Sequence, residues 1–197
     1  MSKYSQLVKI KAAGLSVPRF ESLSWDAFRQ KGGVNTSLRF PLAVRSTYVL
    51  EDGTHQSFAG AFRTELHVEK EHLSAAIDQV FASYPQAEEQ EVILQEMVHA
   101  DYSGVLFAYR QGVWKVEWAA GAGEAIVSGH AEVQSIILPQ FLPVDQLFSS
   151  LWLPWRPPGL QEKSLRRPVL QLSVGARKLL AQEASVEHGL DIEFSIA

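Results

Sequence analysis

Apolar residues recur along the chain with two different periods, which predict the order of its helices and strands. A spacing of three to four residues predicts an amphipathic helix over residues 69–84, where Leu73, Ile77 and Val80 share one face. The same spacing, together with capping and stop residues, predicts helices over residues 3–13, 24–31 and 169–187. Apolar runs predict strands at the stretch that leads into Arg45 and over residues 64–68, 91–98, 104–110, 113–118, 131–138 and 190–196.

Serine and glycine residues mark the ends of the first two predicted helices. Ser2 and Ser24 precede these helices as N-caps, because a serine hydroxyl accepts a hydrogen bond from a free N–H of the first turn. Gly14 and the pair Gly32-Gly33 follow them and predict where they end. Further along, Gln111-Gly112 separates two predicted strands and predicts a hairpin.

Composition narrows the class of protein. The chain has 197 residues, enough for one domain or two small subdomains with a core of their own. A net charge of −4 argues against a nucleic-acid-binding or membrane-binding surface, since both favour basic patches. The absence of cysteine excludes disulfides and zinc–thiolate sites and fits a cytoplasmic protein. No apolar run approaches the length of a membrane span.

Residues 41–64 carry the strongest candidate chemistry. An apolar strand delivers Arg45 and Ser46, and a small-residue loop, Ser57-Phe-Ala-Gly60, follows before the strand that opens at Thr64. A guanidinium matches phosphate oxygens in a planar fork, and glycine lets backbone N–H groups approach an anion. The pattern is typical of a phosphate site, although ordinary strand–loop–strand segments also carry these residue types.

The same stretch resembles a known family. Val44-Arg-Ser-Thr47, Glu51-Asp52, Ser57-Phe-Ala-Gly60 and Thr64 are similar to the "VRSS…ED…SFAG…T" motif of the phosphoenolpyruvate synthase and pyruvate phosphate dikinase nucleotide-binding domain. Thr47 replaces the second serine of that motif and keeps the hydroxyl. The resemblance implies an ATP-grasp-like α+β fold: a mostly antiparallel sheet with flanking helices and a small N-terminal subdomain. It also implies that Arg45, Ser46, Ser57, Gly60 and Thr64 contact ATP.

Three later stretches extend the resemblance. The run from Gln95 to Gly104 resembles "VQxMVxADxSGVxF", which implies that Gln95, Glu96, Met97 and Val98 surround the adenine, with Glu96 acting through its backbone. Residues 121–129 look like "GLGExxVSG" and make Glu124 a ligand candidate. The strand with Asp191 and Glu193 resembles "DIEW", in which the glutamate holds Mg2+ against the ATP phosphates. From the residues alone, core packing, a structural loop and an exposed strand face remain the alternatives.

The N-terminal part departs from the family pattern. Aligning Ala13 to Pro18 with the family's "AGLPVP" places Lys3 on a lysine that contacts ATP phosphates, but the two glycines that precede it are missing. Only residues 21–43 stand where the family has a longer helical segment. We therefore expect a trimmed N-terminal lid subdomain at residues 1–40 and a nucleotide-binding subdomain at 41–197, with a Pro/Trp-rich insertion at about 139–168.

The resemblance implies an Mg-ATP-dependent phosphotransferase domain. Arg45 and Lys3 would act on the phosphates, and the acceptor would be a histidine on another domain or chain, or a small molecule. The family's following "QxRP" strand is not in the sequence. A second hypothesis is therefore a degenerate nucleotide-binding or protein-interaction module that uses Leu151–Trp155. A third is the carboxylate–amine ligase chemistry found on the same fold.

Overall fold

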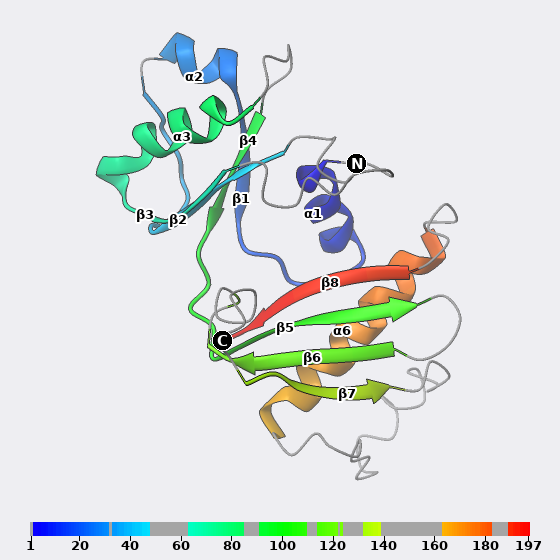
Figure 1. Ribbon diagram of the computed structural model, residues 1–197. Coiled ribbons are helices and arrows are strands. Elements are labelled where there is room, and N and C mark those ends of the chain that lie inside the picture. Colours follow the sequence, from blue (N-terminus) through cyan, green and yellow to red (C-terminus); the bar gives the residue numbers. More distant parts are fainter. Residues whose placement is uncertain are drawn as a thin grey trace. The chain divides into compact units, whose positions relative to one another are not determined.

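The computed structural model describes residues 2–31, 33–47, 63–84, 91–109, 114–121, 123, 132–138, 163–182 and 189–197. The chain forms two compact units, each with its own antiparallel sheet (Figure 1). The first unit comprises Met1–Lys11 and Ser16–Met97, and the second comprises Ala12–Leu15 and Val98–Ala197. The α+β fold with mostly antiparallel strands, predicted from the sequence, is confirmed.

The sheet of the first unit has four strands in the order β1-β4-β2-β3. Their bounds are β1 Phe20–Ser24, β2 Leu42–Ser46, β3 Thr64–Val68 and β4 Glu91–Glu96. The two central strands are the most apolar and the most buried, as expected for strands with a neighbour on both sides. Between Leu42 and Val44 the β2–β3 register shifts, and His67 takes a φ of 53° at this irregularity in β3.

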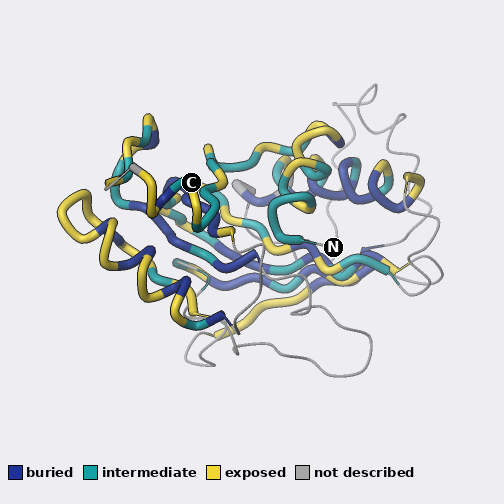
Figure 2. The backbone as a smooth tube through the Cα atoms, turned by 90° about the horizontal axis from the view of Figure 1, so that it is seen from above, coloured by how far each residue is buried: buried dark blue, intermediate teal, exposed yellow. Residues whose placement is uncertain are grey.

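Helices cover one face of this first sheet. These are α2 Trp25–Lys31, the 3-10 turn η2 Lys70–His72 and α3 Leu73–Ala82 (Figure 1). Along α3, buried and exposed residues alternate as the amphipathic pattern predicts, and Figure 2 shows this alternation as dark blue and yellow segments along the helix. Leu42, Val44, Val92 and Leu94 project from the central strands into the same core.

The two predicted N-caps are confirmed. Ser2 Oγ accepts the N–H of Ser5 over 3.2 Å at the start of α1 Lys3–Ala12. Ser24 Oγ accepts the N–H of Ala27 over 3.2 Å at the start of α2. Helix α1 ends before Gly14, whose φ of 88° is the left-handed conformation that glycine adopts readily.

The second unit has a sheet in the order β7-β6-β5-β8, with one helix against it. The strands are β5 Tyr102–Tyr109, β6 Trp114–Ala120, β7 Gln134–Leu138 and β8 Gly189–Ile196. Helix α6 Lys163–Gln182 runs across one face (Figure 1). Alternate strand residues, including Leu106, Val116 and Ile192, are buried on that side.

Three observations differ from the sequence expectations. Helix α6 begins at Lys163 and continues through Pro168, because Leu165 is buried and its burial favours the additional turns. Residues 20–24, for which no strand was predicted, form strand β1. The compact units do not follow the division at residue 40, because β1 pairs with β4 and β4 pairs with β2 in one sheet. None of the described helices has the length and apolar character to cross a membrane.

Candidate nucleotide-binding site

The face of the first sheet turned away from α2 and α3 brings several predicted site residues together. Directly opposed residues on neighbouring strands share a face, so the register defines two rows on it. The first row contains Phe20, Gln95 and Ala43, and the second contains Ser22, Ile93, Arg45 and Thr64. We call this the second face of the first sheet. It carries three residues that the sequence indicated: Arg45, Thr64 and Gln95.

Arg45 is half-buried at the centre of this second face. Its Nη1 donates a hydrogen bond to Oε1 of Gln95 over 3.4 Å. Its Nε is buried, and within the described part of the chain this atom has no hydrogen-bond partner. A buried donor without a partner costs about 1–3 kcal/mol, and a bound anion would remove that cost. The position of Arg45 Nε is therefore compatible with binding of an anionic ligand.

Ser46 and Thr47 follow Arg45 but have different surroundings. Ser46 is fully buried, and strand alternation turns its side chain toward the helix-covered face, away from Arg45. Thr47 donates its N–H to the hydroxyl of Tyr84 over 2.8 Å and its Oγ1 hydroxyl to the carbonyl of Glu91 over 3.0 Å. The Tyr84 hydroxyl also donates to that carbonyl. These bonds fix the end of β2. The hydroxyls of Ser46 and Thr47 are therefore both buried within the first unit.

The end of β4 carries the predicted adenine contacts. The N–H of Glu96 donates to the carbonyl of Arg19 over 2.9 Å, and the N–H of Met97 donates to the carbonyl of Pro41 over 3.2 Å. Both backbone donors are thus engaged within the first unit. Val98 follows with a 38% exposed side chain. The N–H groups of Glu96 and Met97 therefore serve the fold of the first unit at this strand end.

The Glu96 side chain has its own surroundings. Its carboxylate accepts hydrogen bonds from the backbone N–H of Arg39 and from the guanidinium groups of Arg39 and Arg19. The backbone hydrogen bond from Arg39 is the main reason that the pKa of Glu96 lies below its usual range, and the two guanidinium groups add to it. No local pattern in the sequence indicates this arrangement, because Arg19 and Arg39 are far from Glu96 along the chain.

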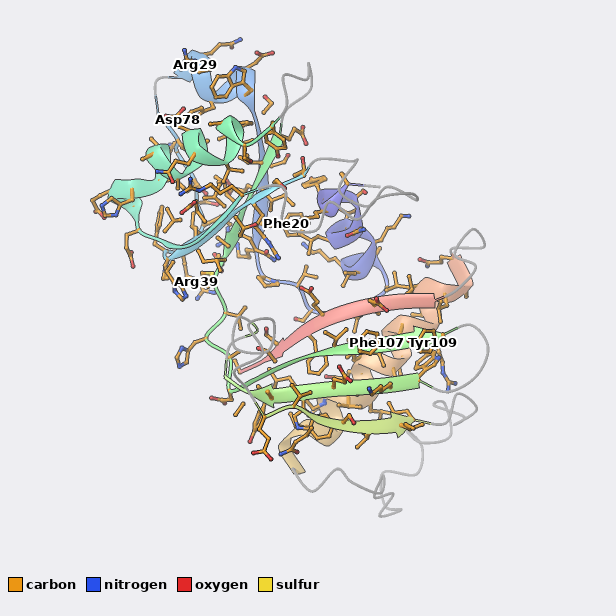
Figure 3. The ribbon with its side chains drawn as sticks, viewed as in Figure 1. Phe20, Arg29, Arg39, Asp78, Phe107 and Tyr109 are labelled. Atoms are coloured by element: carbon orange, nitrogen blue, oxygen red, sulfur yellow. The ribbon has the colours of Figure 1, made fainter. Side chains whose placement is uncertain are left out.

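Helix α1 and β1 enclose a cleft of about 400 Å³ beside the row that begins with Phe20. The ring of Tyr4 meets the ring of Phe20 edge-on, with 5.5 Å between centroids (Phe20 is labelled in Figure 3). Lys3, the predicted phosphate-binding lysine, is the first residue of α1 and is half-buried. The cleft is lined by Tyr4, Val8, Lys11, Val17, Pro18, Arg19, Phe20, Glu21 and Leu38.

In the second unit, the predicted metal ligands share one face of the sheet. Asp191 and Glu193 are exposed on β8, on the side away from the buried Ile192. The register sets Asp191 opposite Phe107 and Glu193 opposite Val105 on β5, where Phe107 is labelled in Figure 3. Partial removal of its carboxylate from water by neighbouring atoms raises the pKa of Asp191. Two carboxylates that lie two residues apart on a strand suit Mg2+, which binds through one or two carboxylates together with phosphate oxygens.

Glu117 is a residue of this face that sequence reasoning missed. It lies across β5 from Glu193, because both are registered with Val105, and it pairs with Lys115. The alternation of β6 was the signal that placed it there. Among the described residues, no group of three or more His, Asp or Glu side chains is placed to hold a metal ion. Ser57, Gly60, Glu124 and Leu151–Trp155 lie outside the described residues.

Comparisons with known proteins agree with the fold and with ATP binding. A family model described as "Pyruvate phosphate dikinase, AMP/ATP-binding domain" matches residues 21–143, more than half of the chain. No curated protein matches the chain in sequence. Solved structures match across almost the whole chain at low identity, which is a likeness of fold.

Three of these structures have TM-scores of 0.50 or more. PH1788 from Pyrococcus horikoshii has a TM-score of 0.54 at 15% identity, covering 93% of this chain and 78% of its own. The dinucleotide-forming acetyl-coenzyme A synthetase 1 of Ca. Korarchaeum cryptofilum has 0.50 at 12% identity, covering 93% and 80%. D-alanine-D-alanine ligase from Helicobacter pylori has 0.50 at 14% identity, covering 98% of this chain but 48% of the ligase. The fold is that of the ATP-grasp proteins.

Proposed function

The chain belongs to the pyruvate phosphate dikinase AMP/ATP-binding domain family, and we propose that it is an Mg-ATP-binding phosphotransferase domain. In this proposal it passes a phosphoryl group to a histidine on another domain or chain, or to a small molecule. ATP binding follows from the family. The choice of site rests on Arg45, which lies on the second face of the first sheet. Its buried Nε has no hydrogen-bond partner among the described residues.

Arg45 is suited to hold the ATP phosphates. Gln95 accepts from Nη1 and thereby orients the guanidinium plane, while Nε remains for an oxygen of the ligand. Thr64, the first residue of β3, lies directly opposite Arg45 on β2 and adds a hydroxyl on the same face. Phosphoryl transfer depends mainly on positioning and on electrostatic stabilisation, which such donors supply. Lys3 at the start of α1 is the second cationic candidate.

The adenine would meet the end of β4. We propose that the carbonyl of Glu96 and the N–H of Val98 contact the base edge, with Met97 and the aliphatic part of Gln95 beside it. This is a narrower assignment than the sequence suggested, because the Glu96 and Met97 N–H groups already donate to Arg19 and Pro41. Ser46 would contribute through its backbone only, since its side chain is buried on the other face.

Metal binding is proposed for the second unit. Glu193, with Asp191 beside it, would hold Mg2+ through hard carboxylate oxygens. Both side chains are exposed and therefore accessible to a metal ion. Bound Mg2+ would neutralise charge on the phosphates. The loop Ser57–Gly60 as a cover and Glu124 as a ligand contact remain predictions from the sequence.

A thermal shift assay with Mg-ATP tests the proposal. Ligand at about 100 times its dissociation constant stabilises a protein by roughly 2.7 kcal/mol, so the melting temperature should rise clearly. The rise should disappear in Arg45→Ala, and it should persist in Arg63→Ala, which alters an exposed arginine paired with Glu65. Absence of a shift in the unaltered chain would refute nucleotide binding and favour a protein-interaction module. Transfer itself is tested by mixing the chain with a phosphohistidine domain and radiolabelled ATP.

A further inference from the structure

We propose that the Glu96 side chain is a positioning residue, which ties the segments before β1 and β2 to the end of β4. It thereby sets the backbone of residues 96–98, where the proposed function places the adenine. This inference rests on that proposed function, but it assigns a role to a carboxylate that the function itself does not use. The Glu96 side chain contacts neither phosphate nor base in this scheme, and it acts through the residues to which it is hydrogen-bonded.

Three hydrogen bonds converge on the carboxylate. Oε1 accepts the backbone N–H of Arg39 over 2.9 Å and Nη1 of Arg19 over 3.4 Å. Oε2 accepts Nη2 of Arg39 over 3.2 Å. Arg19 stands immediately before β1, and Arg39, which is labelled in Figure 3, stands shortly before β2. One side chain therefore connects two segments that are distant in sequence to the last residue of β4.

Backbone hydrogen bonds join the same segments. Glu96 donates its N–H to the carbonyl of Arg19 and accepts from the guanidinium of that residue, so Arg19 is held at two points. Met97 donates its N–H to the carbonyl of Pro41, which lies two residues after Arg39. The N–H groups of Glu96 and Met97 are thus both hydrogen-bonded to these segments, and the Glu96 carboxylate binds the same segments a second time.

The burial of each partner indicates which hydrogen bond of the Glu96 carboxylate contributes most to the tie. The Glu96 side chain is 8% exposed, whereas the side chains of Arg19 and Arg39 are 56% and 84% exposed. Ion pairs with exposed arginines contribute little, because solvent screens them. A backbone N–H bound to a carboxylate needs no side-chain ordering on the donor side and is charge-assisted. The tie should therefore depend on Glu96 more than on either arginine side chain.

The expected consequence is specific to the base. Arg45 lies mid-strand and is held by its register with Ile93, so loss of the Glu96 carboxylate should leave the phosphate contacts in place. The position of residues 96–98 should become less defined, and adenine recognition should weaken. A ligand with phosphates but no base separates these two effects.

The experiment is calorimetric titration with Mg-ATP and with inorganic tripolyphosphate, on the unaltered chain and on Glu96→Ala. We expect Glu96→Ala to weaken ATP binding roughly tenfold, the change that corresponds to one lost charge-assisted hydrogen bond. Tripolyphosphate binding should change less than about twofold. Arg39→Ala keeps its backbone N–H and should weaken ATP binding less than Glu96→Ala does. Glu71→Gln is the control, because Glu71 is an exposed glutamate of η2 that takes no part in these hydrogen bonds.

The outcomes are distinguishable. Equal weakening of ATP and tripolyphosphate, or no change in either, would overturn the positioning role while nucleotide binding stands. If the unaltered chain binds neither ligand, the proposed function fails, and amide hydrogen exchange then tests the tie by itself. Glu96→Ala should accelerate exchange at the Arg39 and Met97 N–H groups about tenfold or more over the unaltered chain, and unchanged exchange would overturn it. Glu96→Gln, which keeps an acceptor oxygen, replaces Glu96→Ala if the latter does not fold.

Discussion

Arg45 and Gln95 lie diagonally across strands β2 and β4, and Nη1 of Arg45 donates a hydrogen bond to Oε1 of Gln95 over 3.4 Å. Each residue is opposed to an apolar neighbour, Ile93 for Arg45 and Ala43 for Gln95. The guanidinium is thus held at one nitrogen on an otherwise apolar part of the face. A fixed orientation combined with a buried Nε that has no partner among the described residues predicts that Arg45 binds a ligand rather than stabilising the fold.

Arg45→Met should therefore separate binding from stability. Removing a buried donor that lacks a partner should leave the free energy of unfolding of the free chain unchanged or raised by about 1 kcal/mol. The stabilisation by Mg-ATP should be lost. Urea denaturation with and without nucleotide measures both quantities, and Arg63→Met serves as the exposed control. A loss of more than about 2 kcal/mol in the free chain would show that Arg45 is structural.

The lowered pKa of Glu96 predicts a defined acid sensitivity. Its folded-state pKa lies below the unfolded value of about 4.3, so the stabilisation is complete above that value and is lost as pH falls through the folded pKa. Glu96→Gln should remove this part of the acid dependence. Urea denaturation from about pH 6 to about pH 3 measures it. Parallel profiles for Glu96→Gln and the unaltered chain would contradict the prediction.

Tyr84 anchors the strand that carries Arg45. Its hydroxyl accepts the N–H of Thr47 over 2.8 Å and donates to the carbonyl of Glu91, and the side chains involved are buried. Tyr84→Phe leaves the Thr47 N–H without that acceptor, so the free energy of unfolding should fall by about 1–3 kcal/mol. Tyr4→Phe keeps the ring contact with Phe20 and should change stability by less than about 0.5 kcal/mol. Similar values for both variants would show that the Tyr84 hydroxyl is not an anchor.

Gly104 allows close packing of three strands in the second unit. A Cβ at this position would lie 2.1 Å from the carbonyl oxygen of Glu117 and 2.6 Å from Cζ of Phe194. Because the first of these atoms is backbone, Gly104→Ala must shift β6, and we expect a loss of about 2 kcal/mol or more in denaturant unfolding. Gly33→Ala meets no atom within 4 Å and is the control. An unaltered midpoint for Gly104→Ala would mean that the strands separate easily here.

Local interactions were predictable from the sequence, and distant ones were not. Ser2 and Ser24 were assigned as caps because a cap bonds to an N–H three residues away. The ties from Glu96 to Arg19 and Arg39 span 77 and 57 residues, so no local pattern indicates them. Ser46 is intermediate: its motif suggested a place beside Arg45, although strand alternation already turns neighbouring side chains to opposite faces.

Glu193→Gln tests the proposed metal ligand without relying on turnover. The substitution keeps the size of the side chain but removes its charge, so Mg2+ affinity should fall while nucleotide binding in the absence of metal stays the same. Thermal shifts with ATP plus Mg2+ and with ATP plus a chelator measure the two contributions. The metal-dependent increment should disappear in Glu193→Gln. It should persist in Glu117→Gln, since Glu117 shares the face but is paired with Lys115. Equal loss of both increments in Glu193→Gln would assign Glu193 to the stability of β8 instead.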